Sequence, residues 1–152
     1  MSQFFHLISF VFFHFLCYNM RNLRGEKIMI GIADKTRQAE AFYQVARDMI
    51  RLIHFKRYDV FSDIVDTSYM NIREIEKYFE KNPDLLPDNP YEKHIIEKKE
   101  LYRINKVNEL TYDIEYDLVH NTNIGYMTMC VQFIHDAVEP YTTVEIKNFR
   151  KN

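Results

Sequence analysis

The chain contains no tryptophan and, in 152 residues, only three glycines, four prolines and two cysteines. So few glycines argue against flexible linkers and against a Gly-rich phosphate-binding loop. Cys17 and Cys130 are too few for a disulfide framework, so we expect a reducing, cytoplasmic environment. The sequence also lacks the GxSxG, HExxH and EF-hand patterns, which excludes the commonest catalytic and ion-binding signatures.

The chain also has no large excess of positive or of negative charge. The formal net charge is −2, which gives no general affinity for nucleic acid or for an anionic membrane. What is abundant is aromatic surface, with 12 phenylalanines and 11 tyrosines. Hydrophobic residues make up 47% and charged residues 28% of the chain, which is ordinary for one globular domain of this length.

An apolar, Phe-rich run occupies residues 4–18. No basic residue precedes it and no small-residue cleavage site follows it, unlike a signal peptide. It is also shorter than the roughly 20 residues that span a bilayer. Residues 24–27 can be encoded by a purine run that resembles a bacterial ribosome-binding site. We therefore predict that translation starts at Met29 and that residues 1–28 are an upstream extension. The alternative is a short apolar anchor, the one case in which we expect membrane contact.

Helical periodicity dominates residues 36–81. Apolar residues recur at helical spacing over 36–55, a shorter stretch follows residues 58–59, and Asn71 has the position of an N-cap before a third helix. The dipeptide at 82–83 ends that helix because proline disfavours helical backbone before it. In the first helix, polar residues are expected mainly on the outside: Arg37, Glu40, Gln44, Arg47, Asp48 and Arg51.

Strict alternation of apolar and polar residues marks a hairpin, with residues 110–119 returning as 124–135 and a loop at 120–123. Further strands are expected at 100–105 and 142–149. The two apolar faces, which we expect to point inward, are Leu110, Tyr112, Ile114, Tyr116 and Leu118, and Met127, Met129, Val131 and Phe133. The order predicts a single α+β domain over 29–152, with two to three N-terminal helices packed on a curved antiparallel sheet of about four strands.

An acidic row lies on the outer face of the first hairpin strand, formed by Asp113, Glu115 and Asp117. Such a row is either a solvated surface or an interaction surface for a basic partner protein, whose association it would accelerate. The inward Tyr112 and Tyr116, with Met127 and Met129, either fill the core or line a ligand pocket, since a buried phenol needs a polar partner.

The nearest approach to a metal cluster is His120, Cys130, His135 and Asp136. An odd separation within one strand places Cys130 and His135 on opposite faces, whereas zinc ligands must converge. We therefore expect no metal and no cofactor.

Three segments carry a family resemblance: residues 56–61 (KRYDVF), 72–78, and 86–92 (LPDNPYE). Together with the order of elements, they resemble small bacterial proteins of the nuclear-transport-factor-2-like, cystatin-like cone fold. Members of this group are uncharacterised or are called immunity proteins of polymorphic toxin systems. The resemblance covers about residues 38–149, although the tryptophan usual in the group's first hairpin strand is missing here. It implies a binding protein, some of whose relatives neutralise a toxin by direct contact.

Enzymes also occur on this fold, including ketosteroid-isomerase-like and dehydratase-like members. Their proton transfers need a carboxylate or an imidazole inside the cone, and the two apolar faces given above contain neither. We therefore expect a non-enzymatic protein-binding module. The alternative is a small-ligand site or enzyme that uses the cone pocket, and a homodimer through the exposed sheet is a third possibility.

Overall fold

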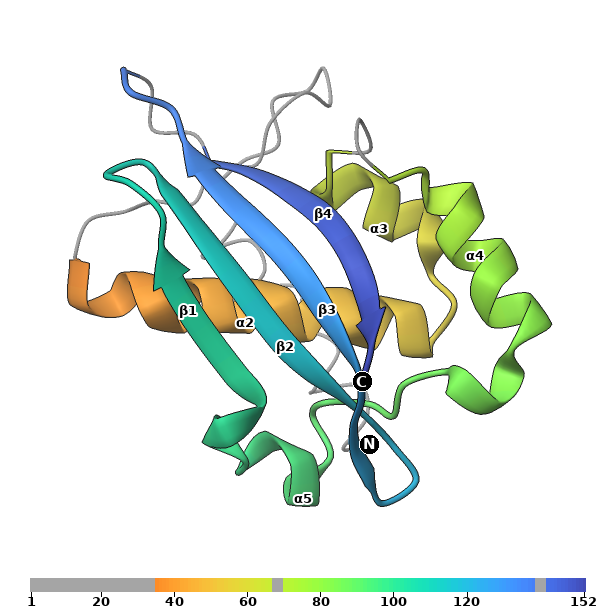
Figure 1. Cartoon of the computed structure of the whole chain (residues 1–152). Coiled ribbons are helices and arrows are strands. Elements are labelled where there is room, and N and C mark those ends of the chain that lie inside the picture. The colour runs from red at the N-terminus through yellow and green to blue at the C-terminus, as the bar shows by residue number, and fades with distance from the viewer. Residues whose placement is uncertain (1–34, 67–69, 139–141) are drawn as a thin grey trace, which may run out of the picture.

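The structure is a computed structural model that describes residues 35–66, 70–138 and 142–152 (Figure 1). The predicted upstream extension, residues 1–28, and the start at Met29 lie outside the described residues.

Three helices form where the periodicity predicts them. They are α2 (Lys35–His54), α3 (Tyr58–Ile64) and α4 (Ile72–Lys81). The Asn71 side chain accepts a hydrogen bond from the backbone N–H of Arg73 at 3.0 Å, which satisfies one of the free donors of the first turn of α4. The helix ends at Asn82, directly before proline, as expected.

A proline-rich segment joins the helices to the sheet. It contains η1 (Pro83–Leu85) and is followed by α5 (Lys93–Ile96) and η2 (Lys99–Leu101). Its backbone is held at several points: His54 Nδ1 bonds to the Pro87 carbonyl at 2.8 Å, and the Asp88 N–H donates to the Val119 carbonyl at 2.7 Å. The segment is therefore part of the domain and not a linker, because both the first helix and the hairpin hold it.

The second half of the chain is a four-stranded antiparallel sheet in sequential order. Its strands are β1 (Tyr102–Lys106), β2 (Thr111–His120), β3 (Asn123–His135) and β4 (Thr142–Lys151). Figure 1 shows that the strands curve and that α2 crosses one face of the sheet. The predicted α+β class, with helices packed on a curved antiparallel sheet of four strands, is confirmed.

The hairpin differs from the prediction at its ends. The loop between β2 and β3 has two residues, Asn121 and Thr122, because the strands continue pairing to His120 and Asn123. A turn this tight needs a positive φ, and Asn121 supplies it at 46°. At the other end, Leu110 does not point into the core but is 38% exposed, since it precedes β2 in the turn after β1.

The core lies between α2 and the inner face of the sheet. Phe42 of α2 and Phe133 of β3 are fully buried, with ring centroids 4.4 Å apart. Burying an aromatic side chain of this kind contributes about 1.5–3 kcal/mol. Both predicted apolar faces, except Leu110, are buried or partly buried in this layer.

The polar face of α2 departs from the prediction. Arg47 and Asp48 were expected mainly outside, but their exposed fractions are 8% and 2%. The reason is Tyr91, which follows the proline-rich segment and packs on this face. Its hydroxyl donates to Asp48 Oδ1, and its ring centroid lies 5.4 Å from the Arg47 guanidinium carbon. The helix is thus covered on a second side that periodicity does not reveal.

Candidate functional site

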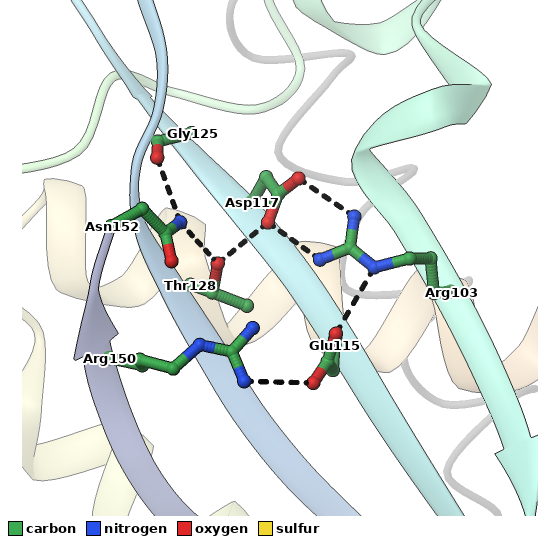
Figure 2. A network of polar contacts seen from close by, with 7 residues as sticks. All are labelled: Arg103, Glu115, Asp117, Gly125, Thr128, Arg150 and Asn152. Carbon is green, nitrogen blue, oxygen red and sulfur yellow. Dashed lines mark hydrogen bonds and ion pairs between the residues drawn. The ribbon is translucent and has the colours of Figure 1, made fainter.

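The side of the sheet that faces away from α2 carries most of the charged side chains of the strands. We call this the outer face. Pairing between strands places its residues opposite one another: Arg103 of β1 faces Glu115 of β2, and Thr128 of β3 lies between Asp117 of β2 and Arg150 of β4. Figure 2 shows the polar network that these side chains form.

Arg103 is the centre of the network. Its two terminal nitrogens donate to the two carboxylate oxygens of Asp117, each at 2.8 Å, and its Nε donates to Glu115 at 3.1 Å. A bidentate arginine–carboxylate pair fixes both side chains in one geometry, unlike an ordinary surface ion pair. A single guanidinium on β1 therefore orders two members of the acidic row.

The network extends across β3 to β4. Arg150 donates from Nη1 to the second oxygen of Glu115 at 3.2 Å. The Thr128 hydroxyl donates to Asp117 at 2.7 Å and accepts from the Asn152 amide at 2.8 Å. Thr128 is fully buried although it points to the outer face, because the network covers it. Side chains from all four strands or their ends are thus held in one connected arrangement.

These contacts shift the ionisation of both carboxylates. The hydrogen bond from Arg103 holds the pKa of Asp117 below its ordinary value, and the Thr128 hydroxyl adds to this. Arg103 and then Arg150 lower the pKa of Glu115 in the same way. Both groups therefore carry their negative charge at neutral pH, and two cations balance them.

The acidic row is consequently a mixed-charge surface rather than a uniform anionic strip. Asp113, its third member, accepts a hydrogen bond from the Gln132 amide at 2.7 Å and has no ion-pair partner within the described residues. The assignment of Asp113, Glu115 and Asp117 as a partner-binding row remains a prediction.

The residues predicted to line a pocket lie inside the core. Tyr116, Met127 and Met129 are each at most 1% exposed, whereas Tyr112 is partly buried against the rings of Phe42 and His135. The Tyr116 hydroxyl is buried without a hydrogen-bond partner among the residues described. Burial raises the pKa of this phenol, so it stays protonated and available as a donor.

Close to Tyr116, two further buried polar atoms have no hydrogen-bond partner that meets the usual geometry among the residues described. They are the Tyr43 hydroxyl and Arg47 Nε, both on α2. The Tyr43 ring centroid lies 5.8 Å from that of Tyr116, and the Arg47 guanidinium carbon lies 4.1 Å from the Tyr43 ring. The Tyr43 and Arg47 side chains both lie close enough to the Tyr116 hydroxyl to shift its pKa through hydrogen-bond contact, so the three groups form one buried polar cluster without a well-aligned hydrogen bond.

The four residues nearest to a metal cluster are not brought together. His120 Nδ1 contacts the Leu86 carbonyl at 2.6 Å, while His135 bonds to the Thr142 hydroxyl at 2.6 Å on the inner side. Cys130 lies on the opposite face, as its odd separation from His135 predicts. In the part of the chain that the structure describes, no three His, Cys, Asp or Glu side chains are grouped closely enough to hold a metal ion.

Comparisons with known proteins found nothing similar: no family model matches the sequence, and neither a curated protein nor a solved structure matches it.

Within the described ranges, no helix combines the length and the apolar character needed to cross a membrane.

Sequence reasoning missed Arg103, Arg150 and Asn152 of the outer network. The signal was present, since the predicted strands at 100–105 and 142–149 flank the acidic hairpin and contain or approach these residues. The register between strands was needed to place them opposite the carboxylates.

Proposed function

We propose that this protein is a non-enzymatic binding module that contacts a partner protein through the outer face of the sheet. The observation that carries the proposal is the network around Arg103, which holds charged side chains of β1, β2 and β4 in fixed positions. None of the described helices lies over this face (Figure 1). A surface ordered before binding loses less side-chain entropy when a partner docks.

Charge suggests the kind of partner. The two arginines balance Glu115 and Asp117, whereas Asp113 adds a carboxylate with no ion pair among the described residues. A partner that presents a basic side chain to Asp113, and apolar or polar groups to the rest, would complement this surface. A toxin neutralised by direct contact, as the family resemblance implies, is the specific case that we propose.

The test uses the full chain and the proteins encoded beside its gene. The affinity of each candidate is measured for the wild type, for Asp113→Lys and for Glu80→Lys. The last is a charge-matched control, because Glu80 is exposed and belongs to α4, which does not lie over the outer face (Figure 1). We expect Asp113→Lys to weaken binding about tenfold or more and Glu80→Lys to leave it unchanged. Equal effects of the two variants would refute the assignment of this face.

Self-association is tested in the same samples. Sedimentation over a range of concentrations should show a monomer for the wild type if the outer face serves a different protein. A dimer that Asp113→Lys dissociates would instead assign the face to a second copy of this chain, and would overturn the proposal.

A small-ligand site inside the core is the second candidate. It is favoured by the buried polar cluster of the Tyr43 hydroxyl, the Tyr116 hydroxyl and Arg47 Nε, none of which makes a well-aligned hydrogen bond within the described residues. A ligand with one acceptor atom could satisfy them. A high-resolution crystal structure tests this. Density for a bound molecule between these atoms supports a ligand site, whereas a single water that contacts all three refutes it.

A further inference from the structure

A groove lies between α4 and the C-terminal part of β4, away from the outer face. Its volume is about 380 Å³, within the range of ligand-binding clefts. Aromatic side chains form its walls, with Phe79 and Phe149 edge to face at 5.8 Å. The residues that line it are Met70, Glu74, Ile75, Tyr78, Phe79, Asn148, Phe149 and Lys151.

The polar groups in this groove differ from those of the outer face in having no partners. Within the described ranges, the side chains of Glu74 and Asn148 and the hydroxyl of Tyr78 make no hydrogen bond or ion pair. Lys151 lies over the Tyr78 ring at 5.9 Å and has no carboxylate partner there. The groove thus combines an apolar floor with free donors and acceptors, which is the composition of a binding cleft.

The groove runs beside an open edge of the sheet. β4 is the last strand of the sheet, so one of its edges does not pair with β3. A described segment pairs with this free edge at only one place. There Asp66 forms a parallel bridge with Glu145, and its N–H donates to the Val144 carbonyl at 2.8 Å. From residue 146 to 151 no other described segment pairs with this edge. Its backbone donors and acceptors are therefore placed to receive another strand.

We propose that this groove binds an extended acidic peptide segment of a partner protein, which adds as a strand to the edge of β4. Alternate side chains of an added strand would point in opposite directions. Those on the helix side would enter the groove beside Tyr78 and Phe149. Those on the other side would lie beside Lys147 and Arg150, which point to the outer face. Apolar residues alternating with acidic ones satisfy both positions.

Charge selects this occupant over a second copy of the chain. Residues 146–151 contain Lys147, Arg150 and Lys151 and no carboxylate. Two such edges brought together would place these cations side by side, which discourages self-pairing. An acidic strand meets the same cations favourably. Lys147 and Arg150 already bond to Glu145 and Glu115, so they would share their charge with the carboxylates of the added strand. Lys151 lies on the groove side, where its positive charge adds to the attraction without facing those carboxylates directly.

The experiment uses the full chain, labelled with ¹⁵N, and a synthetic peptide of about six residues that alternates glutamate with phenylalanine or valine. We expect the peptide to shift the amide signals of residues 146–151 and of α4, and to slow hydrogen exchange along that edge about tenfold or more. Changes confined to β1, the other edge strand, or absent from β4, would overturn the proposal.

Matched peptides test the two interactions separately. Replacing every glutamate by lysine should abolish binding, because the β4 edge is basic. Methylating the backbone nitrogens on the edge that meets β4 should do the same, because it removes the donors needed for strand pairing. Binding that survives methylation would show that the peptide does not add as a strand, and binding by the lysine peptide would show that charge does not select it.

Matched protein variants locate the site. Lys151→Glu should lower the affinity for the peptide about fivefold to tenfold. Lys106→Glu, on the opposite edge strand, should leave that affinity unchanged. Tyr78→Ala should weaken it about tenfold, and Phe55→Ala, which removes an exposed aromatic ring at the end of α2, should have no effect. Asp113→Lys is expected to bind the peptide normally, so failure of the outer-face proposal and failure of this one are distinguishable. If the wild type self-associates and Lys151→Glu changes that self-association, the edge belongs to a second copy of the chain and the peptide proposal is refuted.

Discussion

The buried contact between Tyr91 and Asp48 offers the sharpest test of how this fold is held together. The Tyr91 hydroxyl donates to Asp48, whose exposed fraction is 2%, and accepts from the Gln44 amide. Tyr91→Phe keeps the ring and its packing on the arginines but removes the hydroxyl. A hydrogen bond to a charged group is worth about 1.5–3 kcal/mol, and we expect a loss of about 2 kcal/mol in the free energy of unfolding.

The measurement is urea unfolding followed by circular dichroism, with the midpoint of thermal unfolding as a second readout. A loss of about 2 kcal/mol corresponds to a midpoint lower by about 4–8 °C for a chain of this size. The matched control is Tyr102→Phe, because the Tyr102 hydroxyl donates to the neutral Ala39 carbonyl at 3.1 Å at an exposed position. That variant should lose about 0.5–1 kcal/mol at most.

A double-mutant cycle separates the contact from its surroundings. Asp48→Asn and Tyr91→Phe should each destabilise the protein, and the double variant should lose less than the sum of the two. If Tyr91→Phe costs no more than Tyr102→Phe, or if the two losses add fully, then the proline-rich segment is not held to α2 through this hydrogen bond.

Two pH effects and one capping effect follow from the remaining contacts. Arg103 lowers the pKa of Asp117 and Glu115, so their stabilising effect is complete above the ordinary pKa values and is lost as pH falls through the lowered ones. Arg103→Leu should therefore destabilise the protein at pH 7. The same variant should flatten the pH dependence of the urea-unfolding midpoint between about pH 5 and pH 3. Burial lowers the pKa of His135, so the unfolded chain binds a proton at this imidazole more readily than the folded chain does. The free energy of unfolding should therefore fall as pH drops below about 6.5. His135→Gln should remove this pH dependence in the same assay. Asn71→Ala removes the N-cap of α4 and should cost about 1 kcal/mol, with Asn108→Ala, in the exposed turn after β1, as a control for the loss of another side-chain-to-backbone bond.

The sequence determined the main elements of this protein. The 3.6-residue period of α2 and the two-residue period of β2 and β3 are written into the order of apolar side chains, and each fixes which face is buried. The end of α4 before Pro83 follows from the proline in the same local way. These features were predicted because each depends on residues close together in the chain.

The tertiary structure decided everything that depends on register or on a second layer of packing. Arg103 lies opposite Glu115 only because β1 and β2 pair in one register, and a shift of one residue would turn that side chain to the other face. Arg47 and Asp48 are buried only because Tyr91, more than 40 residues later, packs over them. The groove beside β4 exists because α4 lies alongside the end of that strand. Contacts of this kind join residues that are distant in sequence, so no local pattern specifies them.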